Sequence, residues 1–189
     1  MKKKTTVFLV LTSAFVALTA LATALLAIPG LTGTGYLNFG DAVIFIASCV
    51  LGPLGGAIVG GIGSMIADLF VAPIYAPFTL VVKGLEGFLC GLLYRLAVKK
   101  TSYELVVRII SMLIAGIWMI VGYTLSDWII LCVSGVGCSE ALITAITANA
   151  ITGAVQAGVS IVVALVVSPK RLSEIFSSLS ENKGEGNDI

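Results

Sequence analysis

Of the chain's 189 residues, 58% are hydrophobic and only 11% are charged, and the mean hydropathy is +1.10. Because about one quarter of the residues of an ordinary soluble domain are charged, this composition excludes a soluble fold. The short length favours one compact unit, and the formal net charge of +1 conceals an uneven distribution of charges along the chain.

The first hydrophobic run is uncharged from residue 5 to residue 40. Its segment 6–28 is long enough to cross a hydrocarbon core, which takes about 20 helical residues. The basic residues 2–4 and the Ala-x-Ala at 22–24 also suit a secretory signal peptide, but the apolar region of such a peptide is only about 7–15 residues long. The length therefore favours a retained helix. The Gly- and Thr-rich segment 29–39 predicts turns on the outer side.

The stretch between Asp41 and Asp68 contains no charge and is either one long helix or two shorter ones that meet at Gly52-Pro53. One helix would place the basic residues that follow residue 94 outside, although short cytoplasmic loops collect Lys and Arg. Two helices restore agreement with this rule. The first of them, near 41–51, is however too short for a perpendicular crossing at about 1.5 Å per residue.

Three more spans are expected over 77–97, 105–126 and 141–167, so the sequence predicts an all-α bundle of six transmembrane helices with both termini in the cytoplasm. Every basic residue except Lys83 then lies on the cytoplasmic side. The acidic residues Asp41, Asp68, Asp127 and Glu140 lie on the outer side. We assign 1–169 to the membrane domain and 170–189 to a cytoplasmic tail that begins as an amphipathic helix and ends disordered.

Small residues form two notable stripes. Glycines at spacings of four crowd residues 52–63, and such spacing lets helix backbones approach closely inside a membrane. The first helix has a comparable stripe at Ser13/Ala17 and Ala20/Ala24. That stripe suits either internal packing or contact with a partner subunit.

Several kinds of chemistry are absent from the sequence. It has no histidine and no Cys, Asp and Glu at the spacing of a metal site, so a hydrolytic metalloenzyme is not expected. No Gly-rich turn ends in Gly-Lys-Ser/Thr, so the chain should not hydrolyse ATP by itself. An enzyme that acts on lipids would need a catalytic constellation that the charged loops do not show. Cys49 and Cys90 suit packing, whereas Cys132 and Cys138 lie in an outer loop, where a disulfide is an open alternative.

Lys83 and Glu86 stand out within an otherwise apolar helix. On insertion scales an ionisable group in a membrane segment costs about 2.5–3.5 kcal/mol, so such groups usually face a cavity or each other. The two residues are three apart and share a helix face, which permits an ion pair. They either neutralise each other, or Lys83 extends to the surface, or both contact a ligand. Weaker candidates are Asn149 with Gln156, and Tyr123 with Trp128.

Five short blocks together resemble a known family. They are residues 35–45 (GYLNFGDAVIF), 51–57 (LGPLGGA), 67–69 (ADL), 76–80 (APFTL) and 83–87 (KGLEG). In this order they resemble the substrate-binding S components of energy-coupling factor (ECF) vitamin transporters. The resemblance is closest to the branch with hydroxymethylpyrimidine, pyridoxine-type and riboflavin-type members, and it covers nearly the whole chain.

The resemblance implies a multi-pass protein of the bacterial plasma membrane that is not an enzyme and needs no cofactor or metal. It would capture a water-soluble vitamin or precursor from outside and associate with a transmembrane coupling subunit and two cytoplasmic ATPases. We expect hydroxymethylpyrimidine or a B6 vitamer. The alternatives are riboflavin or pantothenate, or a membrane assembly subunit without transport.

The resemblance also implies positions for the sites. The ligand should lie near the outer ends of the helices, which points to Tyr36, Asn38, Asp41, Tyr75, Lys83, Glu86, Tyr123 and Asn149. Small residues on the first helix should contact the coupling subunit, which points to Ser13, Ala14, Ala17, Ala20 and Ala24. The strict Ala-x-x-x-Ala occurs only at Ala20/Ala24, toward the outer side.

Overall fold

The computed structural model describes residues 2–29, 36–167, 169, 171, 172, 174 and 175. Five long helices account for nearly all of this part, together with one short 3-10 helix and a two-stranded ribbon. In chain order the elements are α1 (Lys2–Leu25), β1 (Ile28–Pro29), β2 (Tyr36–Leu37), α2 (Gly40–Val71), η1 (Pro73–Tyr75), α3 (Ala76–Val98), α4 (Glu104–Val133) and α5 (Cys138–Val166). Among the described residues, five helices are long and apolar enough to cross a membrane.

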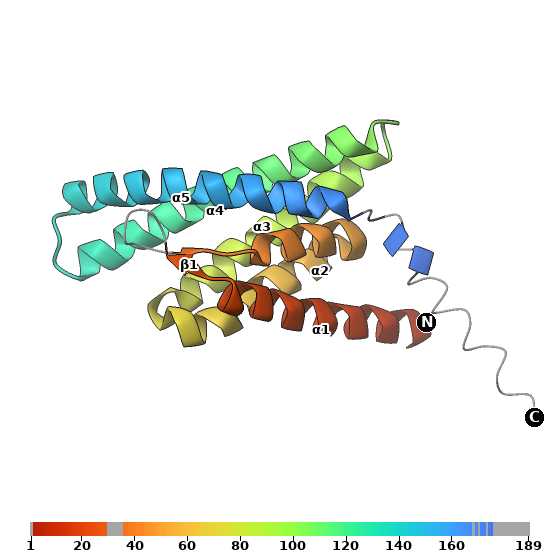
Figure 1. Cartoon of the computed structure of the whole chain (residues 1–189), viewed down its shortest axis with the longest axis horizontal. Coiled ribbons are helices and arrows are strands. Elements are labelled where there is room, and N and C mark those ends of the chain that lie inside the picture. The colour runs from red at the N-terminus through yellow and green to blue at the C-terminus, as the bar shows by residue number, and fades with distance from the viewer. Residues whose placement is uncertain (1, 30–35, 168, 170, 173, 176–189) are drawn as a thin grey trace, which may run out of the picture.

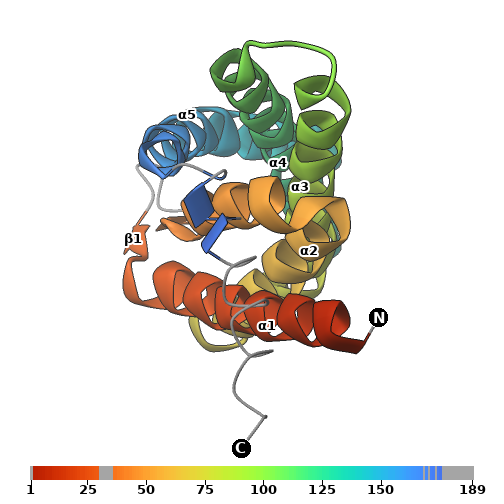
Figure 2. The same ribbon diagram turned by 90° about the vertical axis from the view of Figure 1, so that its right-hand side faces the viewer.

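The helices lie side by side along one axis (Figure 1). The start of α1, the turn between α3 and α4 and the end of α5 lie at one end of the bundle. There Arg108 of α4 donates hydrogen bonds to the carbonyls of Ala164 and Val167, at 2.8 and 2.7 Å, and so ties the end of α5 to the start of α4. Viewed end-on, α2 lies centrally between α1 and the other helices (Figure 2), and it packs against α1, α3 and α5.

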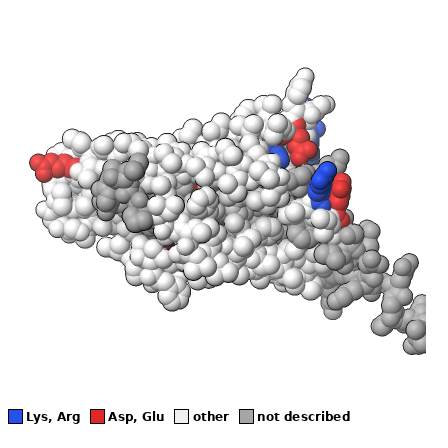
Figure 3. Space-filling model, viewed as in Figure 1, with Lys and Arg blue, Asp and Glu red and all other residues white. Residues whose placement is uncertain are grey.

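Charged side chains gather at the two ends of the bundle, and the surface between them is almost entirely uncharged (Figure 3). Large apolar side chains such as Leu18, Ile117 and Val162 are exposed along the helices. A surface of this kind suits lipid, and helices with internally satisfied backbones are the structures that lipid tolerates. The multi-pass membrane class predicted from composition is confirmed.

The helix α2 is interrupted at Gly52, whose φ of 79° and ψ of −168° are non-helical. Pro53 follows and lacks a backbone N–H, so the helical hydrogen bonds also end here. A Cβ on Gly60 would lie 3.3 Å from Ile44 on the other side of the break. In a straight helix, residues 44 and 60 would be about 24 Å apart at 1.5 Å per residue. The two arms of α2, residues 40–51 and 53–71, therefore fold back on each other as a hairpin.

Arg95 of α3 holds the break in place. Its Nη2 donates a hydrogen bond to the carbonyl of Leu51 at 3.1 Å, and a side chain at Gly52 would overlap the guanidinium. Only glycine fits the positive φ and this close approach together. The break predicted at Gly52-Pro53 is thus a sharp turn at the end of the bundle where α3 ends.

Some expected boundaries are wrong. The span expected to end at Ser126 continues as α4 to Val133, because Asp127 is only 7% exposed and its carboxylate is in hydrogen-bonding reach of Tyr75, so this charge does not mark a surface. The expected turns of 29–39 include the ribbon of β1 and β2, which pairs Ile28 with Leu37. Residues 30–35 and most of the predicted tail at 170–189 lie outside the described residues.

Candidate functional site

Close packing of α3 against the second arm of α2 brings polar residues together in the bundle. A Cβ at either Gly56 or Gly87 would overlap the backbone of the other residue, and a Cβ at Gly60 would overlap the carbonyl of Lys83. Without side chains at these positions the two backbones touch, as small residues allow inside membranes. The face of α3 that carries Lys83 and Glu86 is therefore pressed into the interior.

Lys83 is 1% exposed and lies between two buried carboxylates. Its ammonium forms an ion pair with Asp41, in the first turn of α2, and a second with Glu86 Oε2 at 2.9 Å. Asp41 and Glu86 are both 0% exposed. The ion pair that the spacing of Lys83 and Glu86 permits is present, but the pair is not isolated, because Asp41 also pairs with Lys83. We call Asp41, Lys83 and Glu86 the ion triad.

Gln156 of α5 closes the other side of the triad. Its Nε2 donates a hydrogen bond to Asp41 Oδ2 at 2.7 Å, and its Oε1 accepts one from the backbone N–H of Asn38 at 3.2 Å. The Asn38 side chain in turn accepts a hydrogen bond from the Gly40 N–H at 2.9 Å. One amide thus links α5, the segment that enters α2, and the triad.

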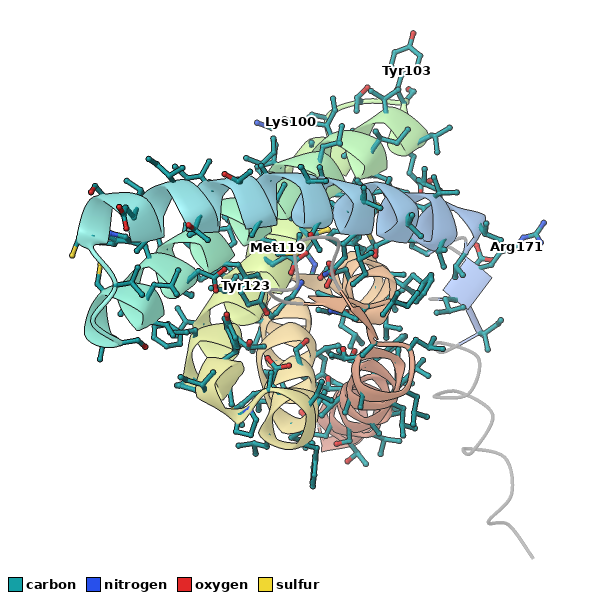
Figure 4. All side chains as sticks on the ribbon, turned by 60° about the vertical axis from the view of Figure 1, so that its left-hand side comes forward. Lys100, Tyr103, Met119, Tyr123 and Arg171 are labelled. Carbon is teal, nitrogen blue, oxygen red and sulfur yellow. The ribbon has the colours of Figure 1, made fainter. Side chains whose placement is uncertain are left out.

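Tyr123 extends the cluster toward the end of the bundle where α2 meets α3. Its hydroxyl lies 3.0 Å from Thr79 Oγ1, and Thr79 also donates to the Asp68 carboxylate. The Lys83 ammonium lies 5.6 Å from the centre of the Tyr123 ring, within the range of a cation–π contact. Tyr123 and Met119 of α4 point into the bundle, whereas Lys100, Tyr103 and Arg171 project from its surface (Figure 4).

The cluster has more acceptors than donors. The carboxylates of Asp41, Asp68 and Glu86 are buried, against the one ammonium of Lys83. Glu86 Oε2 lies 2.9 Å from the Lys83 ammonium, whereas among the described residues Glu86 Oε1 has no hydrogen-bond partner. A buried carboxylate normally accepts hydrogen bonds, so Glu86 has unused capacity in the interior. The arrangement can bind a small group that brings hydrogen-bond donors.

The expected binding residues fall into three groups. Asp41, Lys83, Glu86 and Tyr123 meet in the cluster. Asn38 lies at its edge through its backbone, and Tyr75 lies beyond it, beside Asp127. The side chains of Tyr36, in β2, and Asn149, in α5, are outside what the structure describes.

Gln156, a weaker candidate in the sequence because it shares a helix face with Asn149, lies at the centre of the cluster. Two contributors were not among the candidates, Thr79 and Asp68. Thr79 lies four residues before Lys83 on the same face of α3, so the helical period held a signal for it. Asp68 gave no signal beyond being polar in a hydrophobic helix. Among the described residues, no group of three or more His, Cys, Asp and Glu could hold a metal ion.

The small residues of α1 lie mostly on its outer surface. Ser13, Ala14 and Ala17 are exposed, while Ala20 and Ala24 are partly buried. The face that packs on α2 instead carries threonines, and a Cβ at Gly63 would lie 2.8 Å from Thr19 Cβ. The N-terminal half of the predicted stripe is thus exposed on the surface of the bundle.

Two comparisons with known proteins bear on this arrangement. A family model described as "ECF-type riboflavin transporter, S component" matches residues 3–173. An uncharacterized protein of Pyrococcus woesei, described as lying in a gap 3' region, is 40% identical over 101 residues. That match covers 53% of this chain and 65% of the relative, so the chain spans less than two thirds of it.

Proposed function

Because the chain belongs to the S component family of ECF-type riboflavin transporters, we propose that it captures a small polar vitamin or vitamin precursor from outside the cell. We favour hydroxymethylpyrimidine or a B6 vitamer as the ligand. Uptake is then driven by ATP in a complex with a transmembrane coupling subunit and two cytoplasmic ATPases. As a member of this family the chain is a transport subunit and not an enzyme.

The observation that carries the proposal is the buried carboxylate of Glu86. It is 0% exposed, Oε2 is paired with the Lys83 ammonium at 2.9 Å, and among the described residues Oε1 has no hydrogen-bond partner. Burying an ionisable group in a membrane segment costs free energy, and the cost is larger when one of its oxygens has no hydrogen-bond donor. A ligand that donates hydrogen bonds to Glu86 would offset this cost. A purely structural ion pair gives no reason for a buried carboxylate oxygen to lack a hydrogen-bond donor.

The balance of charge in the cluster favours one class of ligand. The cluster contains the three buried carboxylates of Asp41, Asp68 and Glu86 but only one ammonium, so a ligand with donors or a positive charge gains more than an anionic one. The amino group of an aminopyrimidine, or the hydroxyls and basic ring nitrogen of a B6 vitamer, would supply them. The carboxylate of pantothenate would instead add to the negative charge.

Riboflavin is the main alternative, because the family description names it. Its large tricyclic ring would need a wide pocket lined by aromatic side chains. The Tyr123 ring lies beside Lys83, and the Trp118 indole N–H already donates to the carbonyl of Val82 at 3.1 Å. This environment suits a single small ring better.

The proposed orientation has six membrane passes and cytoplasmic termini. It is supported by the folded-back arms of α2, which act as two passes, and by the position of Arg95 and Arg108 at the end of the bundle where α1 begins. The ion triad then lies in the interior, reached from the outer side. We also propose that the exposed Ser13, Ala14 and Ala17 contact the coupling subunit, with Ala20 and Ala24 at the edge of that contact.

Calorimetric titration of the purified protein tests the ligand. Hydroxymethylpyrimidine, pyridoxine, riboflavin and pantothenate are titrated separately, and thermal unfolding is recorded with each. We expect one of the first two to bind, and to stabilise the fold by about 2.7 kcal/mol at a concentration of 100 times Kd. The variant Leu85→Ala, on the exposed face of α3, is a control that should bind normally.

The other outcomes separate the alternatives. Binding of riboflavin or pantothenate in place of the small heterocycles would contradict our ligand and keep the transport function. Absence of binding and of stabilisation with every compound, by a protein that unfolds cooperatively, would contradict vitamin capture and favour an assembly subunit.

A further inference from the structure

Two cysteines flank the turn between α4 and α5. Cys132 lies in the last turn of α4 and Cys138 is the first residue of α5. Cys132 is partly exposed, Cys138 is exposed, and both are thiols in the structure. The turn lies at the opposite end of the bundle from the start of α1 and the end of α5.

Contacts of the turn place both cysteines on one side of α4. The Trp128 indole N–H donates a hydrogen bond to the carbonyl of Cys138 at 3.1 Å. Trp128 and Cys132 are four residues apart and share a face of α4. Cys138 is thus held against the face from which Cys132 projects.

The backbone of the turn keeps them there. The N–H of Val136 donates to the carbonyl of Leu131 at 3.1 Å, and Gly135 has a positive φ of 87°. This conformation reverses the chain within four residues, between Val133 and Cys138. The side chains of Cys132 and Cys138 thereby interact with each other.

We propose that Cys132 and Cys138 form an intramolecular disulfide that joins the outer ends of α4 and α5. The proposal uses the outward orientation of this turn, which is part of the proposed function. On that side of a membrane disulfides form and persist. The bond would hold together the two helices that bring Tyr123 and Gln156 to the polar cluster.

The oxidant is a disulfide, either a small molecule or a protein dithiol in its oxidised form. The exposed Cys138 thiolate attacks a sulfur of the oxidant, a mixed disulfide forms, and the first thiolate of the oxidant leaves. The Cys132 thiolate then attacks Cys138 Sγ and expels the second. One S–S bond forms in the protein, one breaks in the oxidant, and the two thiol protons end on the two thiols of the reduced oxidant.

Cys49 and Cys90 provide a matched comparison within the chain. They are 7% and 0% exposed, in α2 and α3, and are packed with Phe45 and Tyr94. An oxidant has no access to them, so we expect both to stay thiols. The chain thus carries one accessible and one inaccessible pair.

The test uses the purified full-length chain, so membrane orientation and ligand binding play no part in it. The protein is equilibrated with equal concentrations of reduced and oxidised glutathione, quenched with acid, and alkylated in denaturant. Mass spectrometry then counts the alkylated thiols. In wild type we expect two alkylated thiols and a bridge between residues 132 and 138. In Cys49→Ala/Cys90→Ala we expect the same bridge and no alkylated thiol.

The single variants Cys132→Ser and Cys138→Ser should lose the bridge and carry a glutathione adduct on the remaining cysteine. Reduction should lower the Tm of wild type by about 5 °C and leave that of Cys132→Ser unchanged. Four alkylated thiols in wild type, glutathione adducts on both residues, or a bridge that persists in Cys132→Ser would each overturn the proposal.

Discussion

Gln156 and Asp41, which lie 115 positions apart in the sequence, are joined by a hydrogen bond of 2.7 Å from the amide Nε2 to the carboxylate Oδ2. The same amide accepts a hydrogen bond from the Asn38 N–H. This single side chain therefore connects α5 to the ion triad and to the segment that leads into α2. Through it, Asn38, just before α2, is linked to the charged interior.

We predict that Gln156→Leu destabilises the fold and weakens ligand binding. It removes the donor to Asp41 and leaves a buried carboxylate less satisfied, which costs about 1–3 kcal/mol. The expected drop in Tm is about 3–10 °C for a chain of this size. Thermal unfolding measures it, with Val155→Leu, at the exposed neighbouring position, as the control. Equal Tm values for the two variants would show that this amide is not a structural link.

Glu86→Gln should weaken ligand binding by about ten- to a hundredfold, through loss of a charge-assisted hydrogen bond worth about 1.5–3 kcal/mol. The fold should tolerate the change, because Lys83 keeps Asp41 as a counterion. Calorimetric titration gives the affinity, and thermal unfolding checks the stability. A large loss of stability at unchanged affinity would mean that Glu86 only compensates Lys83.

The double variant Lys83→Met/Glu86→Gln separates the two roles further. It leaves Asp41 buried without its ammonium, so we expect a lower Tm than in Glu86→Gln, and recovery when Asp41→Asn is added. Affinity should stay low in both combinations. Near-wild-type affinity in the double variant would rule out a ligand role for the pair.

Gly87→Ala should destabilise the chain, because its Cβ would overlap the backbone of Gly56 and force α3 away from α2. Overpacking of this kind costs about 1–3 kcal/mol. Gly84→Ala is the matched control three residues earlier on the same helix. There the nearest atom would be 3.6 Å from the added Cβ, so this variant should be neutral or slightly more stable. Thermal unfolding in detergent compares them, and equal losses would refute the close approach.

The orientation can be tested by labelling with a membrane-impermeant maleimide in intact cells. In a Cys132→Ser background, Cys138 should be labelled from outside because it is exposed on the outer turn. Cysteine at position 54, next to the break in α2 and 63% exposed as leucine, should be labelled only after permeabilisation. Strong labelling of position 54 in intact cells would contradict the topology with six membrane passes.

Ala17→Trp should weaken association with the coupling subunit while ligand binding stays intact. Ala17 is exposed on α1, and a bulky ring there would separate two closely packed helices. Co-purification of the complex gives the association, with Ile117→Trp on the exposed surface of α4 as the control. If both variants co-purify equally well, this face of α1 is not the docking surface.

Much of the site was visible in the sequence because its signals are local. The charges of Lys83 and Glu86 stand out in an apolar segment, and their spacing of three residues fixes a shared face whatever the rest of the chain does. The break at Gly52-Pro53 is local too, since proline removes a hydrogen bond and glycine permits a positive φ. These features needed no knowledge of neighbouring helices.

Contacts between helices were beyond the reach of such signals. Asp127 was taken as the limit of a span, yet it is buried in α4, because a charge can be sheltered by a partner on another helix. Asp41 was expected in the site only from a family resemblance, and its ion pair spans 42 positions. Such pairs depend on how each helix is rotated about its axis relative to its neighbours. The composition and periodicity of a single segment do not determine that rotation.

By itself, the sequence determined that this protein is embedded in a membrane, which segments form its hydrophobic helices, and which residues are too polar for their surroundings. The hydropathy and charge of a segment depend only on its own residues, so these properties follow from the local sequence. Only the tertiary structure decided that Lys83 has two carboxylate partners and that Gln156 completes the cluster. It also decided that α1 turns its threonines inward and its small residues outward. These outcomes depend on how closely glycine-containing backbones approach, which is a property of pairs of helices.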